Sequence, residues 1–168
     1  MLTALLAAVS IVLARLCVIW ITPSVRVSFG NIPIMLAGLM FGPVAGVLAG
    51  AVADIVGATL LSPYGWYAPL TAGPMLIGLI AALPRRWVRQ GNTYWKTLAM
   101  TLGANVIASM AYTTWILSGY QGTPIGALLA ARVPLYIGMS LIEALVLTAL
   151  LHSPVMRYAD DLREGSET

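Results

Sequence analysis

The chain has 168 residues, of which 60% are hydrophobic and 9% are charged, and its formal net charge is +3. Soluble domains carry roughly 25% charged residues, so this composition excludes an ordinary soluble domain and indicates an integral membrane protein. The one cysteine, Cys17, excludes a disulfide framework and a cysteine-rich metal cluster. We therefore expect no metal, no cofactor and no nucleic-acid partner.

Hydropathy and chain breakers predict an all-α fold, a compact bundle of six transmembrane helices. In chain order the helices are Leu2–Ile21, Ile32–Phe41, Val44–Leu61, Leu70–Leu83, Trp95–Leu117 and Gly126–Leu151. The first lacks the basic leading region of a signal peptide, so we take it as a membrane span. We expect residues 1–156 to form this six-helix transmembrane domain and residues 157–168 to form a charged cytoplasmic tail.

The strongest packing signal lies between Arg26 and Gly57. Glycines recur there every four residues, at Gly38, Gly42, Gly46 and Gly50. This spacing places small residues on one helix face and lets a second backbone approach closely inside a bilayer. Gly42–Pro43 interrupts the run, because proline lacks the amide donor that a helix needs. A helical hairpin is favoured over one long kinked helix, which would exceed the roughly 20 residues of a span.

Basic residues set the expected orientation. Four of the nine lie near the connection between Leu83 and Trp95, at Arg85, Arg86, Arg89 and Lys96, and the tail adds Arg157 and Arg163. Because cytoplasmic loops carry an excess of Lys and Arg, both termini are predicted to be cytoplasmic. The aromatic and glycine-rich loops then face outward.

Polar residues at membrane depth are costly and usually face a partner or a cavity. They are Arg15, Asp54, Asn105, Arg132 and Glu143. A structural ion pair between Arg15 and Asp54 is the simplest expectation. Arg132 and Glu143 share one helix face, but eleven residues at about 1.5 Å each place them too far apart for contact. Each is expected to find its partner elsewhere.

Arg26, Asn105 and Arg132 are expected to converge on an outward cavity with an aromatic rim. The rim residues are Trp66, Tyr67, Tyr112, Trp115, Tyr120 and Tyr136. Aromatic walls with a few donors suit a planar, anionic organic ligand. An interfacial aromatic belt is the alternative for any single ring, whereas the Trp66–Tyr67 pair favours function. The candidate substrate-binding residues are Arg26, Asn31, Trp66, Tyr67, Thr71, Asn105, Tyr112, Arg132 and Tyr136.

Enzyme motifs are absent from the sequence. It contains no Gly-x-Ser-x-Gly, no paired intramembrane aspartates and no Walker motif, and His152 stands alone at a helix end. We therefore expect no catalytic residue, and any ATP-driven work belongs to a partner chain.

The run RVSFGNIPIMLAGLMFGPVAGVLAGAVADIVG, residues 26–57, resembles the S components of energy-coupling factor (ECF) vitamin transporters, most of all their folate-specific branch. The resemblance covers the first three predicted helices and the Pro-Tyr-Gly-Trp-Tyr loop after them. Over the last three helices it is only architectural. The run is long enough to be fairly specific for the family and less specific for the vitamin.

The resemblance implies a small six-helix protein of a prokaryotic plasma membrane that captures a vitamin in an outward pocket. Loops at Thr22–Asn31 and Ser62–Pro69 would close this pocket. Its partners would be a transmembrane coupling protein and two ATPase subunits. Docking would use an Ala-x-x-x-Ala surface, here Ala4 and Ala8, although these alanines could instead pack internally or face lipid.

For folate, we hypothesise that Tyr67 and Trp66 flank a ring system and that Asn105, placed by our helix reading alone, contacts polar ring edges. Arg26, which matches the family's arginine before the Phe-Gly segment, or Arg132 would meet a carboxylate. An S component for pantothenate, riboflavin or a thiamin-like compound remains an alternative, as does a small membrane-embedded enzyme or assembly factor. A cationic ligand fits less well, because Asp54 and Glu143 are the only carboxylates at membrane depth.

Overall fold

The computed structural model of the chain describes residues 2–15, 18–22, 25–61, 67–89, 94–122 and 124–153. Within these ranges the α-helices are α1 (Leu2–Arg15), α2 (Asn31–Phe41), α3 (Pro43–Leu61), α4 (Ala68–Ala82), α5 (Arg85–Arg89), α6 (Tyr94–Ala104), α7 (Thr113–Gln121) and α8 (Ile125–Leu151). A π-helix, η1 (Asn105–Tyr112), joins α6 to α7, and two short strands, β1 (Val18–Thr22) and β2 (Val25–Ser28), pair antiparallel.

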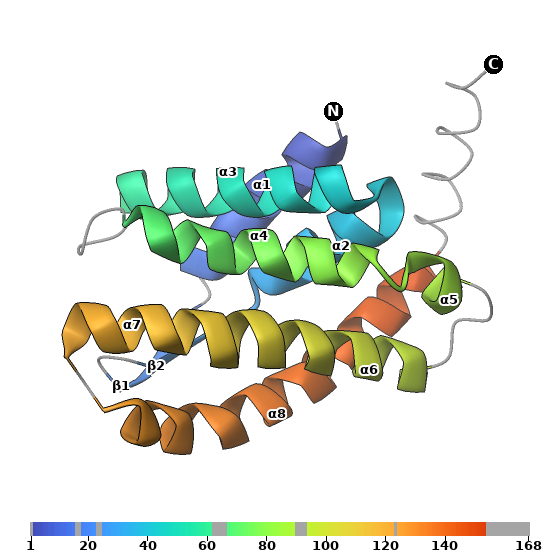
Figure 1. Cartoon of the computed structure of the whole chain (residues 1–168). Coiled ribbons are helices and arrows are strands. Elements are labelled where there is room, and N and C mark those ends of the chain that lie inside the picture. Colours follow the sequence, from blue (N-terminus) through green and yellow to red (C-terminus); the bar gives the residue numbers. More distant parts are fainter. Residues whose placement is uncertain are drawn as a thin grey trace.

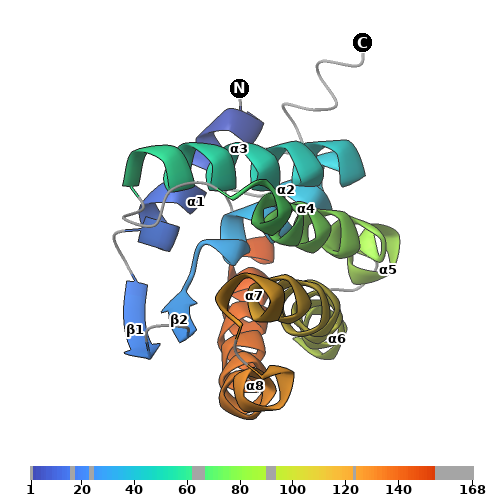
Figure 2. The ribbon, with the colours of Figure 1, turned by 60° about the vertical axis from the view of Figure 1, so that its left-hand side comes forward.

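The helices form two groups that lie side by side (Figures 1 and 2). One group contains α1, α2, α3 and α4, and the other contains the continuous rod α6–η1–α7 packed along α8. The strand pair lies at the end of the bundle where α7 ends and α8 begins, and α5 lies at the opposite end (Figure 1). The predicted helical class is confirmed.

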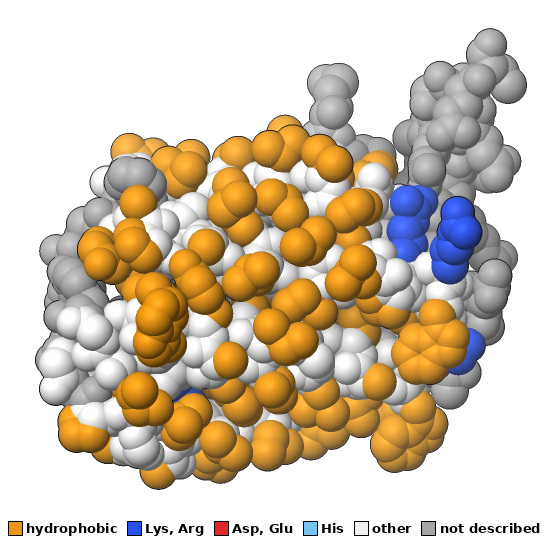
Figure 3. All heavy atoms as spheres, viewed as in Figure 1, with side chains coloured by type: hydrophobic (Ala, Val, Ile, Leu, Met, Phe, Trp, Pro, Cys, Tyr) orange, Lys and Arg blue, Asp and Glu red, His pale blue; other side chains and the backbone are white. Residues whose placement is uncertain are grey.

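Two described helices are long and apolar enough to cross a membrane, over Pro43–Leu60 and Ile125–Leu151. Thr3–Ala14, Asn31–Phe41 and Ala68–Ala82 are apolar but shorter. The count of six membrane spans therefore stays a prediction. The outer face drawn in Figure 3 is covered by apolar side chains, and Lys and Arg gather at the α5 end. This distribution suits a surface in contact with lipid.

The glycine spacing brings three helix backbones together, as predicted. A Cβ built on Gly38 or on Gly46 would lie 2.5 Å from the carbonyl oxygen of Gly78 on α4. A Cβ on Gly50 would meet the backbone of Pro74, also on α4. Because only glycine leaves room for these contacts, α2 and α3 pack directly against the α4 backbone.

The predicted turn between α2 and α3 is confirmed. Gly42 has φ +98°, and its amide donates to the Gly38 carbonyl oxygen at 3.0 Å. A positive φ is costly for residues with a side chain, so glycine suits this position. Pro43 then starts α3, where its missing amide donor has no consequence.

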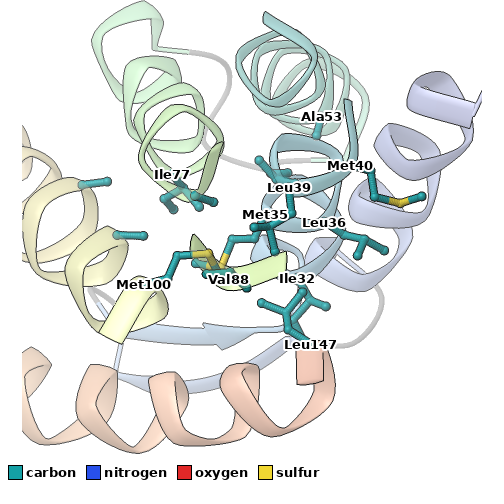
Figure 4. Packing of buried hydrophobic residues seen from close by; sticks show 14 residues of the cluster. Ile32, Met35, Leu36, Leu39, Met40, Ala53, Ile77, Val88, Met100 and Leu147 are labelled. Carbon is teal, nitrogen blue, oxygen red and sulfur yellow. The ribbon is translucent and has the colours of Figure 1, made fainter. Parts of the chain in front are cut away.

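Helix α2 is the centre of the core. Every residue from Ile32 to Met40 is buried. Figure 4 shows Met35 and Leu39 of α2 among side chains from α4, α5, α6 and α8, including Ile77, Val88, Met100 and Leu147. A helix surrounded on all sides explains why α2 is apolar around its whole circumference.

The prediction that the first helix continues to Ile21 was wrong. Helix α1 ends at Arg15, and Val18–Thr22 forms a strand in which Trp20 pairs with Arg26. The segment VIWIT is rich in β-branched and aromatic residues, which favour strands. Hydropathy alone does not separate a short apolar strand from the end of a helix.

The helix predicted at Trp95–Leu117 extends further, from Tyr94 to Gln121, and contains the π-helix η1. Helix α5 was not predicted, because its five residues, three of them arginine, carry no apolar run. Neither feature gives a signal in hydropathy, which reports the apolar length of a segment and not its hydrogen-bond pattern.

Candidate functional site

Buried polar side chains follow the interface between the rod α6–η1–α7 and α8. They are Thr97, Thr101, Asn105, Ser109, Thr114, Arg132, Ser140 and Glu143, and we call this set the polar seam. All eight are at most 6% exposed in an otherwise apolar interior. Buried polar groups need hydrogen-bond partners, so the contacts along the seam identify candidate ligand-binding atoms.

Arg132 closes one end of the seam, against η1. Its Nη1 donates to the carbonyl oxygen of Ser109 at 3.3 Å and to Thr114 Oγ1 at 3.1 Å. Thr114 Oγ1 itself donates to the Ser109 carbonyl oxygen at 3.3 Å. Arg132 is 6% exposed, and its Nε has no hydrogen-bond partner among the described residues. The guanidinium therefore stabilises η1 through Nη1. Its buried Nε–H remains available to an acceptor outside the described residues.

Glu143 and Asn105 meet deeper in the seam. Asn105 Nδ2 donates to Glu143 Oε2 at 2.6 Å and to Ser140 Oγ at 2.9 Å. The Ser140 hydroxyl in turn donates to the Tyr136 carbonyl oxygen at 2.7 Å. Glu143 is fully buried, and its Oε1 has no partner among the described residues. Asn105 is thus oriented by α8, with its amide donor already used inside the chain.

Asn31 faces the same carboxyl group from the start of α2. Two contacts fix this helix start. Ser10 Oγ donates to the Gly30 carbonyl oxygen at 2.6 Å, and a Cβ on Gly30 would lie 2.5 Å from the Ala14 Cβ. From the sequence, Asn31 was expected at the outer edge of the membrane. In the structure its side chain lies beside Glu143, which belongs to the buried polar seam.

Thr71 is directed elsewhere. Its Oγ1 donates to Asp54 Oδ2 at 2.8 Å, a contact that ties α4 to α3. The Asp54 carboxylate thus accepts a hydrogen bond from Thr71. The predicted ion pair of Asp54 with Arg15 stays a prediction, because the Arg15 side chain lies outside the described part.

The aromatic candidates divide into three environments. The Tyr112 hydroxyl donates to the Pro69 carbonyl oxygen at 3.0 Å and joins η1 to the start of α4. Tyr67, which precedes α4, is 40% exposed. Tyr136 is half-buried on α8, one turn after Arg132. The side chains of Arg26, Trp66 and Tyr120 lie outside the described residues, so their predicted places are not addressed.

Trp115 lies on α7 next to the seam residue Thr114, at the surface. It is 64% exposed and lines an apolar groove of about 300 Å³ on the outer surface. The other lining residues are Val106, Met110, Ala111, Thr114, Ile125 and Leu129. For Trp115 both the rim position and the interfacial alternative stay predictions, since an exposed ring is compatible with either.

The structure brings Asn31 and Asn105 together around Glu143, which the sequence had left without a role. Thr71, Tyr67 and Tyr112 lie toward α4, apart from this group. Glu143 had been recognised as a costly intramembrane charge, but its contact with Asn105, 38 positions away, has no signal in the sequence. Among the described residues there is no group of three His, Cys, Asp or Glu side chains that could hold a metal ion.

The proposed docking residues lie on an open face of α1. Ala4 and Ala8 are exposed, whereas Ala7 is 3% exposed and packs with Ala37 and Ala49. The alternative that Ala4 and Ala8 pack inside the bundle is therefore contradicted. Leu5, which is 60% exposed, continues the same apolar surface.

Comparison with known proteins identifies the family. A family model described as the S component of the ECF-type riboflavin transporter matches residues 1–156. Two curated relatives are named folate transporter FolT. The protein from Clostridium novyi is 42% identical over 48 residues, 29% of this chain and 27% of the relative. The protein from Leuconostoc mesenteroides is 29% identical over 122 residues, 71% of this chain and 64% of the relative.

The matched stretches thus span about a quarter and just under two thirds of these relatives. A solved structure described as FolT bound with folic acid covers 92% of both chains, with a TM-score of 0.78 and 26% sequence identity. Members of this family are S components of transporters and not enzymes. The chain belongs to the family of S components of ECF-type riboflavin transporters.

Proposed function

We propose that this chain captures folate from outside the cell and delivers it to an ATP-driven coupling complex. The observation that carries the proposal is the likeness, over 92% of both chains, to a FolT structure solved with folic acid. The two curated relatives named folate transporter support the same ligand.

The chemistry of the polar seam supports an anionic, planar ligand. Folate joins a pterin ring through an aminobenzoate to a glutamate that carries two carboxylates. Arg132 holds a buried Nε–H without a partner among the described residues, and such a donor suits a carboxylate. Tyr136 lies on the same face of α8 and can contact a ring.

Riboflavin is the second candidate, because the matching family model is described by that vitamin. Riboflavin is planar, but its ribityl chain carries hydroxyl groups and no carboxylate. The buried guanidinium of Arg132 therefore favours folate over riboflavin as the ligand. Hydrogen bonds from arginine to a carboxylate are about twice as strong as those between neutral groups.

A panel of vitamins tests the ligand. The purified chain in detergent is heated with folic acid, riboflavin, pantothenate or thiamin, and the thermal midpoint is recorded. A ligand at 100 times its Kd stabilises the folded state by about 2.7 kcal/mol. We expect a clear rise in the midpoint with folic acid alone. A rise with riboflavin and none with folic acid would contradict the proposal.

The family and the charge distribution support a particular cellular arrangement. We place the chain in the plasma membrane of a prokaryote, with both termini and the tail, residues 157–168, in the cytoplasm. The basic residues at the α5 end support this orientation (Figure 3). The proposed partners are a transmembrane coupling protein and two ATPase subunits, and the strand pair β1–β2 then lies on the outer side.

Small residues on α1 are proposed to receive the coupling protein. We expect Ala4→Trp with Ala8→Trp to abolish co-purification with the coupling complex, because the added bulk prevents close approach of a partner helix. Folic acid binding should not change, since both alanines lie outside the polar seam. Leu145→Trp is the matched control on α8, where the replaced side chain is 61% exposed. Undiminished co-purification of the α1 variant would exclude this surface.

A further inference from the structure

We propose that the α5 end of the bundle binds an anionic phospholipid, with its phosphate at Arg86 and Lys96 and its acyl chains along the exposed apolar side chains beside them. The residues of this surface, which we call the α5 patch, are Leu83, Arg86, Trp87, Trp95 and Lys96. The inference concerns a surface outside the polar seam and does not involve the vitamin.

The first step is the orientation of α5. Val88 is fully buried and packs in the core (Figure 4). An α-helix turns about 100° per residue, so the two positions before Val88 point sideways and outward. Arg86 is accordingly exposed, and Trp87 is 50% exposed. Arg85 is directed to the turn after α2, where its Nη1 would lie 3.4 Å from a Cβ built on Gly42.

The second step is the positive charge of the α5 patch. The Lys96 ammonium lies 5.5 Å from the centroid of the Trp87 ring and donates to the Trp87 carbonyl oxygen at 3.2 Å. These contacts hold Lys96 beside the residue that follows Arg86 in the chain. The carboxyl groups among the described residues lie elsewhere, with Asp54 between α3 and α4 and Glu143 buried in the polar seam. Neither balances the two cations, so an anion fits this surface.

The third step is the apolar part of the α5 patch. Leu83 is 73% exposed, and Trp95 is 72% exposed. Tyr94 positions the Trp95 indole, because the two rings meet edge to face at 5.9 Å and the Tyr94 hydroxyl donates to the Leu141 carbonyl oxygen at 3.3 Å. Exposed indoles settle at the level of the lipid headgroups. Figure 3 shows basic side chains next to large apolar ones at this end of the bundle.

A ligand that matches both parts of the patch has an anionic head and acyl chains. An anionic phospholipid has both, whereas a free phosphate ion matches only the cations. The α5 end is also the end that we place in the cytoplasm, and the cytoplasmic leaflet carries anionic lipids. Because Arg86 belongs to α5 and Lys96 to α6, a phosphate that contacts both would join the two groups of helices (Figure 1).

The test compares lipids by native mass spectrometry of the full chain in detergent. Phosphatidylglycerol and phosphatidylcholine with the same acyl chains are added in equal amounts, and glycerol phosphate is added alone in a separate sample. We expect the chain to retain one phosphatidylglycerol in preference to phosphatidylcholine and to retain no glycerol phosphate. Equal retention of the two lipids, or binding of glycerol phosphate as tight as that of the lipid, would overturn the inference. This comparison uses the unaltered chain and does not depend on the folding of a variant.

Arg86→Gln combined with Lys96→Gln tests the residues. We expect the affinity for phosphatidylglycerol to fall roughly 30-fold, which corresponds to about 1 kcal/mol for each cation. The matched control is Arg157→Gln combined with Arg163→Gln, which removes the same charge from the tail and should keep the preference for phosphatidylglycerol. An equal loss in both variants would reduce the effect to net charge and overturn the assignment to the α5 patch.

The acidic tail is the alternative occupant of the patch, since residues 157–168 carry four carboxylates and two arginines. A full-length variant with Asp160→Asn, Asp161→Asn, Glu164→Gln and Glu167→Gln distinguishes the two. We expect this variant and the unaltered chain to retain phosphatidylglycerol equally. Retention by the variant alone would show that the tail occupies the α5 patch, and this result would overturn the inference. None of these outcomes bears on folic acid binding, so the proposed function is tested separately.

Discussion

Gly78→Ala should destabilise the chain more than any other single methyl group added to the glycines of this bundle. The new Cβ would overlap the backbone carbonyl of Gly46, and a backbone atom cannot move aside as a flexible side chain can. We expect a loss of about 3 kcal/mol in the free energy of unfolding. For a chain of this size that corresponds to a fall of roughly 10 °C in the thermal midpoint, measured in detergent by tryptophan fluorescence.

Gly103→Ala is the matched control. Gly103 lies in α6, and a Cβ built there meets nothing within 4 Å. Alanine favours a helix over glycine by up to about 1 kcal/mol, so this variant should be unchanged or slightly more stable. Equal midpoints for Gly78→Ala and Gly103→Ala would show that the glycine contacts do not hold α3 and α4 together.

Arg132→Met should weaken folic acid binding by roughly 100-fold, because it removes the buried cation proposed to meet the ligand carboxylates. Binding of p-aminobenzoylglutamate should be lost to a similar degree, whereas 6-hydroxymethylpterin should bind as before. Calorimetry on the purified variant measures all three affinities.

Arg132 also contacts the Ser109 carbonyl oxygen of η1, so its loss could act on the ligand or on the helix. Comparing the affinities of the three ligands distinguishes these two roles. A damaged π-helix would weaken the ring fragment as well. Arg86→Met makes the same change of charge at exposed Arg86 of α5 and should leave every affinity unchanged. If Arg132→Met bound folic acid as tightly as the unaltered chain, Arg132 would have only a structural role, at η1.

Much of the fold could be predicted because membrane helices are specified by local patterns. Apolar length, the Gly42–Pro43 break and the four-residue glycine spacing predicted α2, α3 and their close packing. The partner glycine, Gly78, could not be assigned, because it lies on another helix and only the tertiary arrangement brings it to Gly46. The strand Val18–Thr22 was missed because an apolar strand and an apolar helix end have the same hydropathy.

The sequence identified the polar side chains of the candidate site but not the contacts among them. Asn105 and Arg132 were expected to need partners because polar side chains are costly at membrane depth, and both are buried; their convergence on an outward cavity stays a prediction. The contact of the Thr71 hydroxyl with Asp54, which joins α4 to α3, was not predicted, and the role of Thr71 in binding stays a prediction. The group around Glu143 depends on contacts between α2, η1 and α8, and sequence spacing does not determine such contacts.

The vitamin that accompanies the chain through purification tests the central claim most directly. The protein is isolated from cells without added vitamin and washed extensively, and the bound compound is identified by its absorption spectrum and by mass spectrometry. We predict a folate in close to one copy per chain. A flavin in its place, or a chain that is empty and does not take up added folic acid, would contradict the account.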